Sequence, residues 1–173
     1  MAGQKAFTAR AAGKFWDDSE SLECCSVVPE ALNTVTISFV SPSGAQFRYD
    51  PGQFVTLELP VPGGTVWRTY TISSSPSRPM TLSVTVKAQT DSIGARWMQD
   101  TLRPGMRIKA SGPAGLFTLP TQDKDKYLFI SAGSGITPSL SMTTYLFDRG
   151  TDIDVVLVNC AQRPKDIIAR QQL

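Results

Sequence analysis

The sequence predicts a β domain followed by an α/β domain: a six-stranded antiparallel Greek-key barrel with one covering helix, then the first β–α–β part of a second sheet. Two observations predict this. Before Pro120, short runs that alternate apolar and polar residues are separated by Gly, Pro and Ser turns, which is typical of antiparallel strands. After Pro120 the strands become continuous apolar runs on either side of a helical stretch, which is typical of parallel strands joined by a helix.

The first region contains six predicted strands and one predicted helix. β-Branched residues are enriched in the strands, and turn residues stand between them. The helix is predicted at Ile93–Leu102, where Ile93, Trp97, Met98 and Leu102 fall on one face. Strands this short and this closely spaced favour a closed barrel or a sandwich. The strands are Leu22–Val28, Asn33–Val40, Gln53–Leu59, Val66–Ile72, Leu82–Lys87 and Met106–Ser111.

The second region begins after a polar linker at residues 121–125. The run Tyr127–Ser131 predicts a strand buried on both faces, and a helix follows that extends to Arg149. A second buried strand, Val155–Val158, and a helix at Pro164–Leu173 come next. Because two strands cannot close a doubly wound sheet, we expect this domain to be incomplete in the chain. We therefore divide the chain into a loosely ordered leader (1–17), a barrel domain (18–120) and a partial α/β domain (125–173).

Composition argues against several classes of function. The chain has no histidine, which removes imidazole ligands and histidine-based acid–base mechanisms. Cys24, Cys25 and Cys160 match neither a zinc nor an iron–sulfur spacing, so we expect reduced thiols and no metal site. The net charge of +2 gives no basis for binding nucleic acid or an anionic membrane. Because we find neither a secretory apolar segment nor a run long enough to span a bilayer, we expect a soluble, cytoplasmic protein.

The segment Trp67–Ser73 carries the first chemical motif. Residues two apart in a strand share a face, so Arg68 and Tyr70 are expected to project together. A guanidinium can hold a phosphate through two hydrogen bonds while a nearby aromatic ring covers a planar heterocycle. Thr71 and Ser73 add hydroxyl groups. Taken alone, the segment is also compatible with an ordinary exposed strand.

Two helix starts that contain glycine carry the other motifs. Gly94 lies at the start of the predicted helix, where a phosphate can approach aligned backbone N–H groups, although a helix without a ligand fits the pattern too. The loop Gly133-Ser134-Gly135-Ile136-Thr137-Pro138 stands between a buried strand and a helix, which is the setting of a dinucleotide-binding loop. Proline suits the first turn of that helix. We interpret this second segment as a nucleotide-binding loop.

Taken together, these segments resemble the ferredoxin–NADP reductase superfamily. Arg68-Thr69-Tyr70-Thr71 is similar to its flavin signature R-x-Y-[S/T]. Gly112-Pro113-Ala114-Gly115-Leu116-Phe117 is similar to the G-P-x-G-x-F turn that closes its flavin domain, and Gly133 to Pro138 is similar to its nicotinamide loop G-x-G-x-T-P. The three motifs stand in the family's order, and the resemblance covers about residues 20–173.

Three further segments narrow the resemblance: Pro51–Leu57, Arg68–Pro76 and Ala161–Ile168. They are most similar to FAD-dependent reductase components of Rieske-type oxygenases that demethylate glycine betaine and similar quaternary amines. Hybrid-cluster-protein and phenol-hydroxylase reductases are also similar. Reductases of the betaine type carry a C-terminal [2Fe–2S] ferredoxin domain, so the resemblance implies a truncated relative without that cluster.

The resemblance implies a role for each matched position. Arg68 would neutralise the FAD pyrophosphate, Tyr70 would lie against the isoalloxazine, and Thr71 would bond near its N5. Gly94–Arg96 would cradle the pyrophosphate. Tyr70, Thr71 and Thr137 are the residues expected beside the reacting rings. The complete set expected to bind FAD or NAD(P)H is Arg68, Tyr70, Thr71, Ser73, Thr85, Val86, Lys87, Gly94, Ala95, Arg96, Gly133, Gly135, Thr137, Pro138 and Arg163.

The implied function is that of a flavoprotein oxidoreductase. It would take hydride from NADH or NADPH onto FAD and pass electrons singly to an iron–sulfur centre or an oxygenase partner. Two other hypotheses stay open: an FAD-binding module without turnover because its nicotinamide domain is incomplete, and a barrel that binds a protein partner through a surface containing Arg68 and Tyr70. The sequence leaves open the choice between NADH and NADPH and the substrate of the oxygenase.

Overall fold

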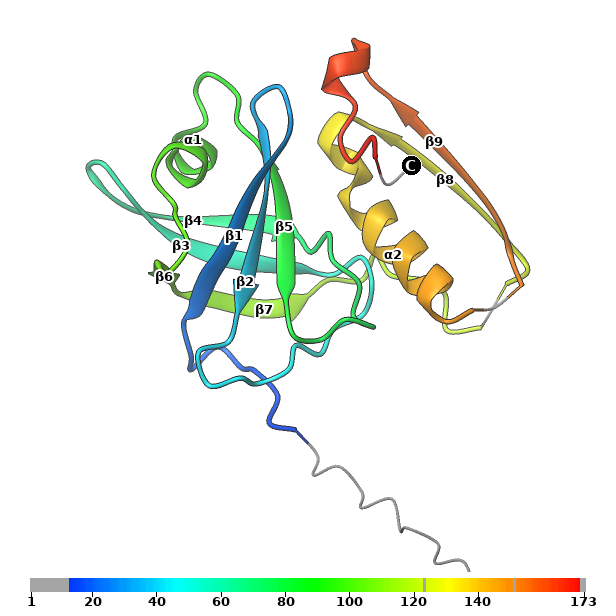
Figure 1. Ribbon diagram of the computed structural model, residues 1–173, viewed down its shortest axis with the longest axis horizontal. Helices are drawn as coiled ribbons and strands as arrows, with labels where there is room; N and C mark the ends of the chain where they lie inside the picture. The colour runs from blue at the N-terminus through cyan, green and yellow to red at the C-terminus, as the bar shows by residue number, and fades with distance from the viewer. Residues whose placement is uncertain (1–12, 123, 151, 172–173) are drawn as a thin grey trace, which may run out of the picture.

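The computed structural model describes residues 13–122, 124–150 and 152–171, and it contains a β barrel followed by a smaller α/β unit (Figure 1). The barrel consists of two antiparallel sheets, with strand orders β5-β2-β1-β6 and β4-β3-β7. Its strands are β1 (Leu22–Ala31), β2 (Thr34–Val40), β3 (Phe54–Val61), β4 (Gly64–Thr71), β5 (Leu82–Lys87), β6 (Arg107–Ile108) and β7 (Ala110–Ala114).

The two sheets join at both edges, and this makes the barrel. At one edge β4 and β5 meet through a bridge between Ile72 and Val84. At the other edge the chain passes from β6, which pairs with β1, into β7, which pairs with β3. The strand predicted at Met106–Ser111 is therefore divided at Lys109, because the chain changes sheets there. The predicted antiparallel barrel is confirmed, with seven strands among the described residues in place of six.

Alternating side chains fill the interior of the barrel. The inward residues of β2 are buried and stand directly opposite inward residues of β5, so the two strands form one apolar layer. These pairs are Val35 with Val86, Ile37 with Val84, and Phe39 with Leu82.

The start of the described chain belongs to this core. Trp16 is buried, stacks at a tilt against Phe47 with ring centroids 5.7 Å apart, and donates its backbone N–H to Gln46 O at 2.9 Å. Trp16 falls within the predicted leader of residues 1–17, and in the structure its large apolar ring belongs to the core of the barrel. Residues 1–12 of that leader lie outside the described residues.

Helix α1 (Ile93–Asp100) packs near β3, β4 and β5, with Trp97 and Met98 buried beneath it. It is two residues shorter than predicted, since Leu102 follows the helix and is buried in the core without being helical. Ile93, predicted on the apolar face, is exposed because it is the first residue of the helix and lies at its rim.

The second unit contains two parallel strands, β8 (Lys126–Ala132) and β9 (Asp154–Cys160), joined by a 3-10 turn η1 (Gly133–Ile136) and helix α2 (Thr137–Asp148). Figure 1 shows α2 on the side of these strands that faces the barrel. Leu128 and Ile130 on the other face are 64% and 72% exposed. The prediction that β8 is buried on both faces is therefore wrong, because α2 covers only one face and no element of the described chain covers the other.

The segment after β9 does not form the helix predicted at Pro164–Leu173. A short 3-10 turn, η2 (Pro164–Asp166), is followed by turns in which Ala169 has a φ of 56°. Ile168 and Ala169 pack against Ile136 and Leu140, and this burial decides the local conformation over helix propensity. Residues 172–173 lie outside the described part. No helix in residues 13–122, 124–150 and 152–171 is long and apolar enough to cross a membrane.

Candidate functional site

β4 and β5 diverge from the point where the two sheets meet, and we call their facing sides the β4–β5 edge. Each strand ends its own sheet, so each has one side without a strand partner beyond the Ile72–Val84 bridge, as far as the structure describes the chain. The Ile72 N–H donates to Gln53 O in the direction of β3. Because the N–H and C=O groups of successive residues in a strand point to opposite sides, those of Trp67 and Thr69 point away from β3, to the β4–β5 edge.

Arg68 and Tyr70 lie on one face of β4, as predicted. They stand opposite Leu57 and Val55, which are buried in the barrel. Tyr70 packs partly against this core, and its burial raises the pKa of its hydroxyl, an effect that the charge of Arg68 opposes. Arg68 is exposed, and its Nη1 donates to Trp67 O at 2.8 Å. The guanidinium therefore lies at the β4–β5 edge.

Thr71 projects from the opposite face of β4. It stands across from Phe54, and its neighbour on that face, Thr69, shares a 3.0 Å hydroxyl hydrogen bond with Thr56. The Thr71 side chain therefore points away from the face that carries Arg68 and Tyr70. Its backbone groups, but not its hydroxyl, can reach a ligand on the side of Arg68 and Tyr70.

The N-terminus of α1 lies directly against Arg68. A Cβ atom on Gly94 would come within 3.1 Å of Arg68 Cγ and 3.0 Å of Leu59 Cδ1, so an added side chain would push these two side chains aside by a few tenths of an ångström. The first helical hydrogen bond runs from Arg96 N–H to Ser92 O at 2.9 Å. The preceding N–H groups of the helix, up to that of Ala95, have no acceptor within the helix, and its first turn holds no acidic residue. The stem of the Arg68 side chain therefore lies against the start of a helix whose first N–H groups have no acceptor in the helix, an arrangement suited to a phosphate group.

The β5 residues predicted at the site have different surroundings. The Val86 side chain is in the barrel core, so only its backbone can meet a ligand, while Lys87 is exposed. The Thr85 hydroxyl bonds to those of Thr36 (2.9 Å) and Ser73 (3.0 Å). Ser73 and Thr85 are thus brought together, in a hydroxyl-lined cleft of about 360 Å³ between the outer face of the barrel and the second unit.

The predicted nucleotide-binding loop lies beside the same strand. Cα atoms of η1 come within 8 Å of those of β5. Gly133 has a φ of 52°, and a Cβ on either Gly133 or Gly135 would meet only open space, so the loop leaves room for a ligand. Thr137 is buried, and its hydroxyl donates to Ser134 O at 3.2 Å, so it shapes the loop and does not face that space. Pro138 lies in the first turn of α2.

Arg163 stands apart from this group. It is exposed after the end of β9, and its carbonyl accepts the Asp166 N–H at 2.9 Å. The structure also brings Ser74 to this site, a residue that the sequence analysis does not single out. Its hydroxyl bonds to Tyr49 OH at 2.8 Å and accepts the Ser83 N–H at 2.9 Å. No local sequence signal predicts these contacts, because the partners are far apart in the chain.

These features fit the pyrophosphate and the flat ring of a flavin nucleotide. The fit rests on the close contact of Gly94 with Arg68, which a Cβ would crowd, and on the Arg68 guanidinium, for which the described residues provide no carboxylate partner. The described residues contain no cluster of three or more His, Cys, Asp or Glu side chains able to hold a metal ion.

Two family models match the chain. Residues 27–119 match an oxidoreductase FAD-binding domain, and residues 129–173 match an oxidoreductase NAD-binding domain. The predicted resemblance to FAD- and NAD-dependent reductases is confirmed.

Similar proteins of known function are reductase subunits. The chain is 63% identical over 159 residues to a stachydrine N-demethylase reductase subunit of Rhizobium meliloti, covering 92% of this chain and 45% of that protein. It is 41% identical over 159 residues to a glycine betaine monooxygenase reductase subunit of Pseudomonas aeruginosa, covering 91% of this chain and 43% of that protein. The chain thus spans less than half the length of these relatives.

Solved structures show the same fold at low identity. Phthalate dioxygenase reductase superimposes with a TM-score of 0.76 at 23% identity, over 88% of this chain and 47% of that one. The FAD/NAD-binding domain of nitric oxide dioxygenase from Vibrio cholerae gives 0.80 at 19% identity, over 88% of this chain and 67% of that one.

Proposed function

Because the chain belongs to the oxidoreductase family with this FAD-binding domain, we propose that it is the flavin-binding part of a reductase that takes hydride from NAD(P)H onto FAD and passes electrons singly to an iron–sulfur or oxygenase component. The observation that carries the proposal is the contact of Arg68 with the N-terminus of α1 at Gly94, beside an open strand edge. It supplies a cation, free N–H groups and an adjacent aromatic side chain in one place.

Each of these groups has a task. Arg68 and the first N–H groups of α1 bind the pyrophosphate, with charge and helix dipole acting together. Tyr70 supports the ring system from the barrel side, and backbone groups at the β4–β5 edge offer hydrogen bonds to its heteroatoms. Ala95 contributes backbone only, since it has no hydroxyl group.

The loop of η1 brings the second nucleotide to the first. Its glycines leave open space next to β5, where a nicotinamide ring can approach a flavin held at the β4–β5 edge. Bound FAD supplies the step from a two-electron hydride donor to one-electron acceptors. The chain itself orients the two rings and excludes water from between them. None of its side chains needs to act as an acid or a base.

The relatives suggest the assembly in which this occurs. Two are named as reductase subunits for stachydrine demethylation and for glycine betaine oxygenation. We extend this to the chain as the reductase component of an oxygenase system for quaternary ammonium compounds. We place it in the cytoplasm, where NAD(P)H is available and exposed thiols such as Cys25 and Cys160 stay reduced.

An absorption spectrum of the purified chain, taken without oxygen before and after NADH is added, tests the proposal. Flavin bands that bleach are the expected result. Bands that persist would indicate that the chain is an FAD-binding module without turnover, the first of the two other hypotheses. A chain that stays colourless after incubation with FAD would show that Arg68 and Tyr70 are surface residues and that the proposal is wrong.

A further inference from the structure

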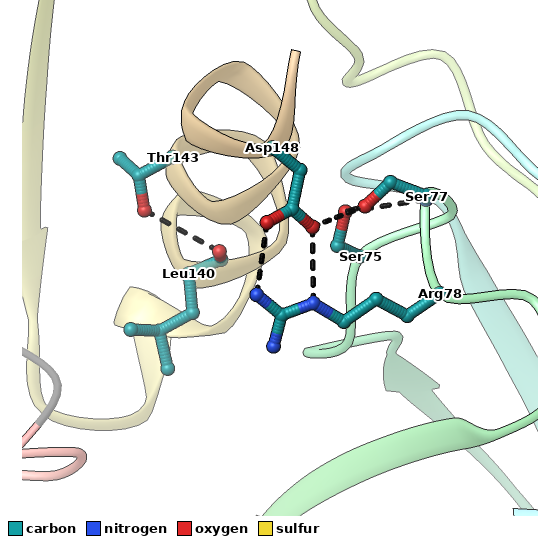
Figure 2. Close-up of polar contacts among 6 residues, drawn as sticks. All are labelled: Ser75, Ser77, Arg78, Leu140, Thr143 and Asp148. Carbon is teal, nitrogen blue, oxygen red and sulfur yellow. Dashed lines mark hydrogen bonds and ion pairs between the residues drawn. The ribbon is translucent and has the colours of Figure 1, made fainter. Parts of the chain in front are cut away.

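The loop between β4 and β5 is fastened to α2 by polar contacts at two levels. Near the start of the helix, the buried Ser141 hydroxyl donates to Ser74 O at 2.6 Å. At its last residue, Asp148 accepts two hydrogen bonds from Arg78, Nε–Oδ2 at 3.0 Å and Nη2–Oδ1 at 2.9 Å, and a third from the Ser77 hydroxyl. Figure 2 shows the Arg78 guanidinium and Asp148 carboxylate facing each other, with Ser77 approaching from the same loop. We call these five residues the latch.

The latch fixes both the position and the direction of the helix. Ser141 and Asp148 are seven residues apart, so they lie two turns apart on one face, a separation of roughly 10 Å along the axis. Two polar contacts at this separation constrain the direction of the helix axis more than one would, and they add to the packing of Met142 against Gly52. The carboxylate is 17% exposed, and the hydrogen bonds from Arg78, followed by that from Ser77, lower the pKa of Asp148, so it stays charged at neutral pH.

Each side of the latch leads directly to one half of the proposed site. The loop that carries Ser74, Ser77 and Arg78 follows β4 with Arg68 and Tyr70, and it leads into β5. The helix that carries Ser141 and Asp148 starts at Thr137, directly after the η1 loop. A movement of α2 against this loop therefore changes the distance between η1 and β5.

We propose that Arg78 and Asp148, with Ser77, are positioning residues that hold the nicotinamide loop in register with the flavin strands. The inference rests on the proposed function and adds residues to it that touch neither nucleotide. Their task is to keep the hydride donor and acceptor at reacting distance, where a displacement of 1 Å costs about 100-fold in rate.

The substitution Asp148→Asn removes the charge with little change of shape. The matched control is Glu23→Gln, because the Arg107–Glu23 pair (2.8 Å) is also an arginine–carboxylate contact but lies within the barrel. The exchanged pair Arg78→Asp with Asp148→Arg tests for rescue. The first readout is amide hydrogen exchange of residues 73–81 and 137–148, which needs no cofactor. The second is the limiting rate of FAD reduction by NADH, measured alongside the Kd for FAD.

In Asp148→Asn we expect exchange in both segments to accelerate about fivefold and the limiting reduction rate to fall about tenfold, in line with a sub-ångström displacement. The Kd for FAD should change less than about twofold, because the latch residues are not part of the proposed pyrophosphate site at Arg68 and the start of α1. The exchanged pair should recover most of the rate, and Glu23→Gln should behave as the wild type.

Two results would overturn the inference, and they differ from failure of the proposed function. An Asp148→Asn chain with wild-type exchange and a wild-type reduction rate would remove the positioning role alone. A rate that falls only in proportion to lost FAD binding would show a general structural role instead. A wild-type chain whose bound FAD stays oxidised would remove the proposed function, and the positioning role with it.

Discussion

Gly94 lies so close to Arg68 that a single added Cβ atom would stand 3.1 Å from the Cγ of that arginine. The start of α1 and the middle of β4 are thus held in contact, 26 positions apart in the sequence. The contact brings the only strongly basic group of β4 to the positive end of a helix, and both favour an anion bound between them.

Gly94→Ala should weaken FAD binding about tenfold while changing stability little. Alanine favours the helix by about 1 kcal/mol over glycine, and this offsets the crowding against flexible side chains of Leu59 and Arg68. The displaced arginine then no longer meets the phosphate. Fluorescence titration with FAD and urea unfolding measure the two effects. Asp100→Ala, an exposed change on the same helix, is the control, and equal FAD affinity in both variants would contradict the prediction.

Arg68→Ala should raise the Kd for FAD about 10- to 100-fold, because charge-assisted hydrogen bonds to a phosphate contribute about 1.5–3 kcal/mol. Arg68→Lys should recover part of this affinity, since lysine keeps the charge but not the two-bond geometry. The midpoint of thermal unfolding without FAD should stay close to that of the wild type, because Arg68 is exposed. Calorimetric titration checks the affinity. If Arg68→Ala and Arg107→Ala bound FAD equally well, the assignment of the phosphate to Arg68 would be wrong.

The sequence predicted well what depends on local pattern. Strand β5 was predicted with the bounds that the structure has, because its alternation matches a strand with one buried face. The joint projection of Arg68 and Tyr70 follows from the same period of two. The glycines Gly133 and Gly135 lie between a strand and a helix, as their pattern predicts, and their role in nucleotide binding stays a prediction.

What the sequence did not predict depends on distant partners. The continuous apolar run of β8 predicts a strand with two apolar faces, but it does not indicate how many of these faces another element covers. The residues of Pro164–Leu173 favour a helix, yet burial of Ile168 and Ala169 against α2 and η1 requires a turn. Arg78 and Asp148 are 70 residues apart, and only the fold brings them together.

Trp16→Ala should destabilise the barrel by about 3–5 kcal/mol, the usual cost of removing a buried aromatic side chain. The change removes the contact with Phe47 and the hydrogen bond from the indole N–H to Glu20 O at 2.9 Å. Phe15→Ala should cost less than about 1 kcal/mol, because that ring is 47% exposed. Urea unfolding followed by circular dichroism compares the two variants. A small cost for both would mean that the chain before β1 contributes nothing to the core.

Tyr49 should make the stability of the protein fall with rising pH above about 10. Burial raises the pKa of Tyr49 from 10.0 to about 12, against the smaller opposite effect of its hydrogen bond with Ser74. The unfolded chain therefore releases this proton first, so the folded state binds more protons between the two values. Its contribution to stability is complete below pH 10 and is lost as pH rises toward 12, with a slope of at most about 1.4 kcal/mol per pH unit. Tyr49→Phe has no proton to release, so the difference in unfolding free energy between wild type and variant should shrink from pH 9 to pH 11. A difference that stays constant or grows over that range would show that the Tyr49 hydroxyl is not held in its neutral form by the fold.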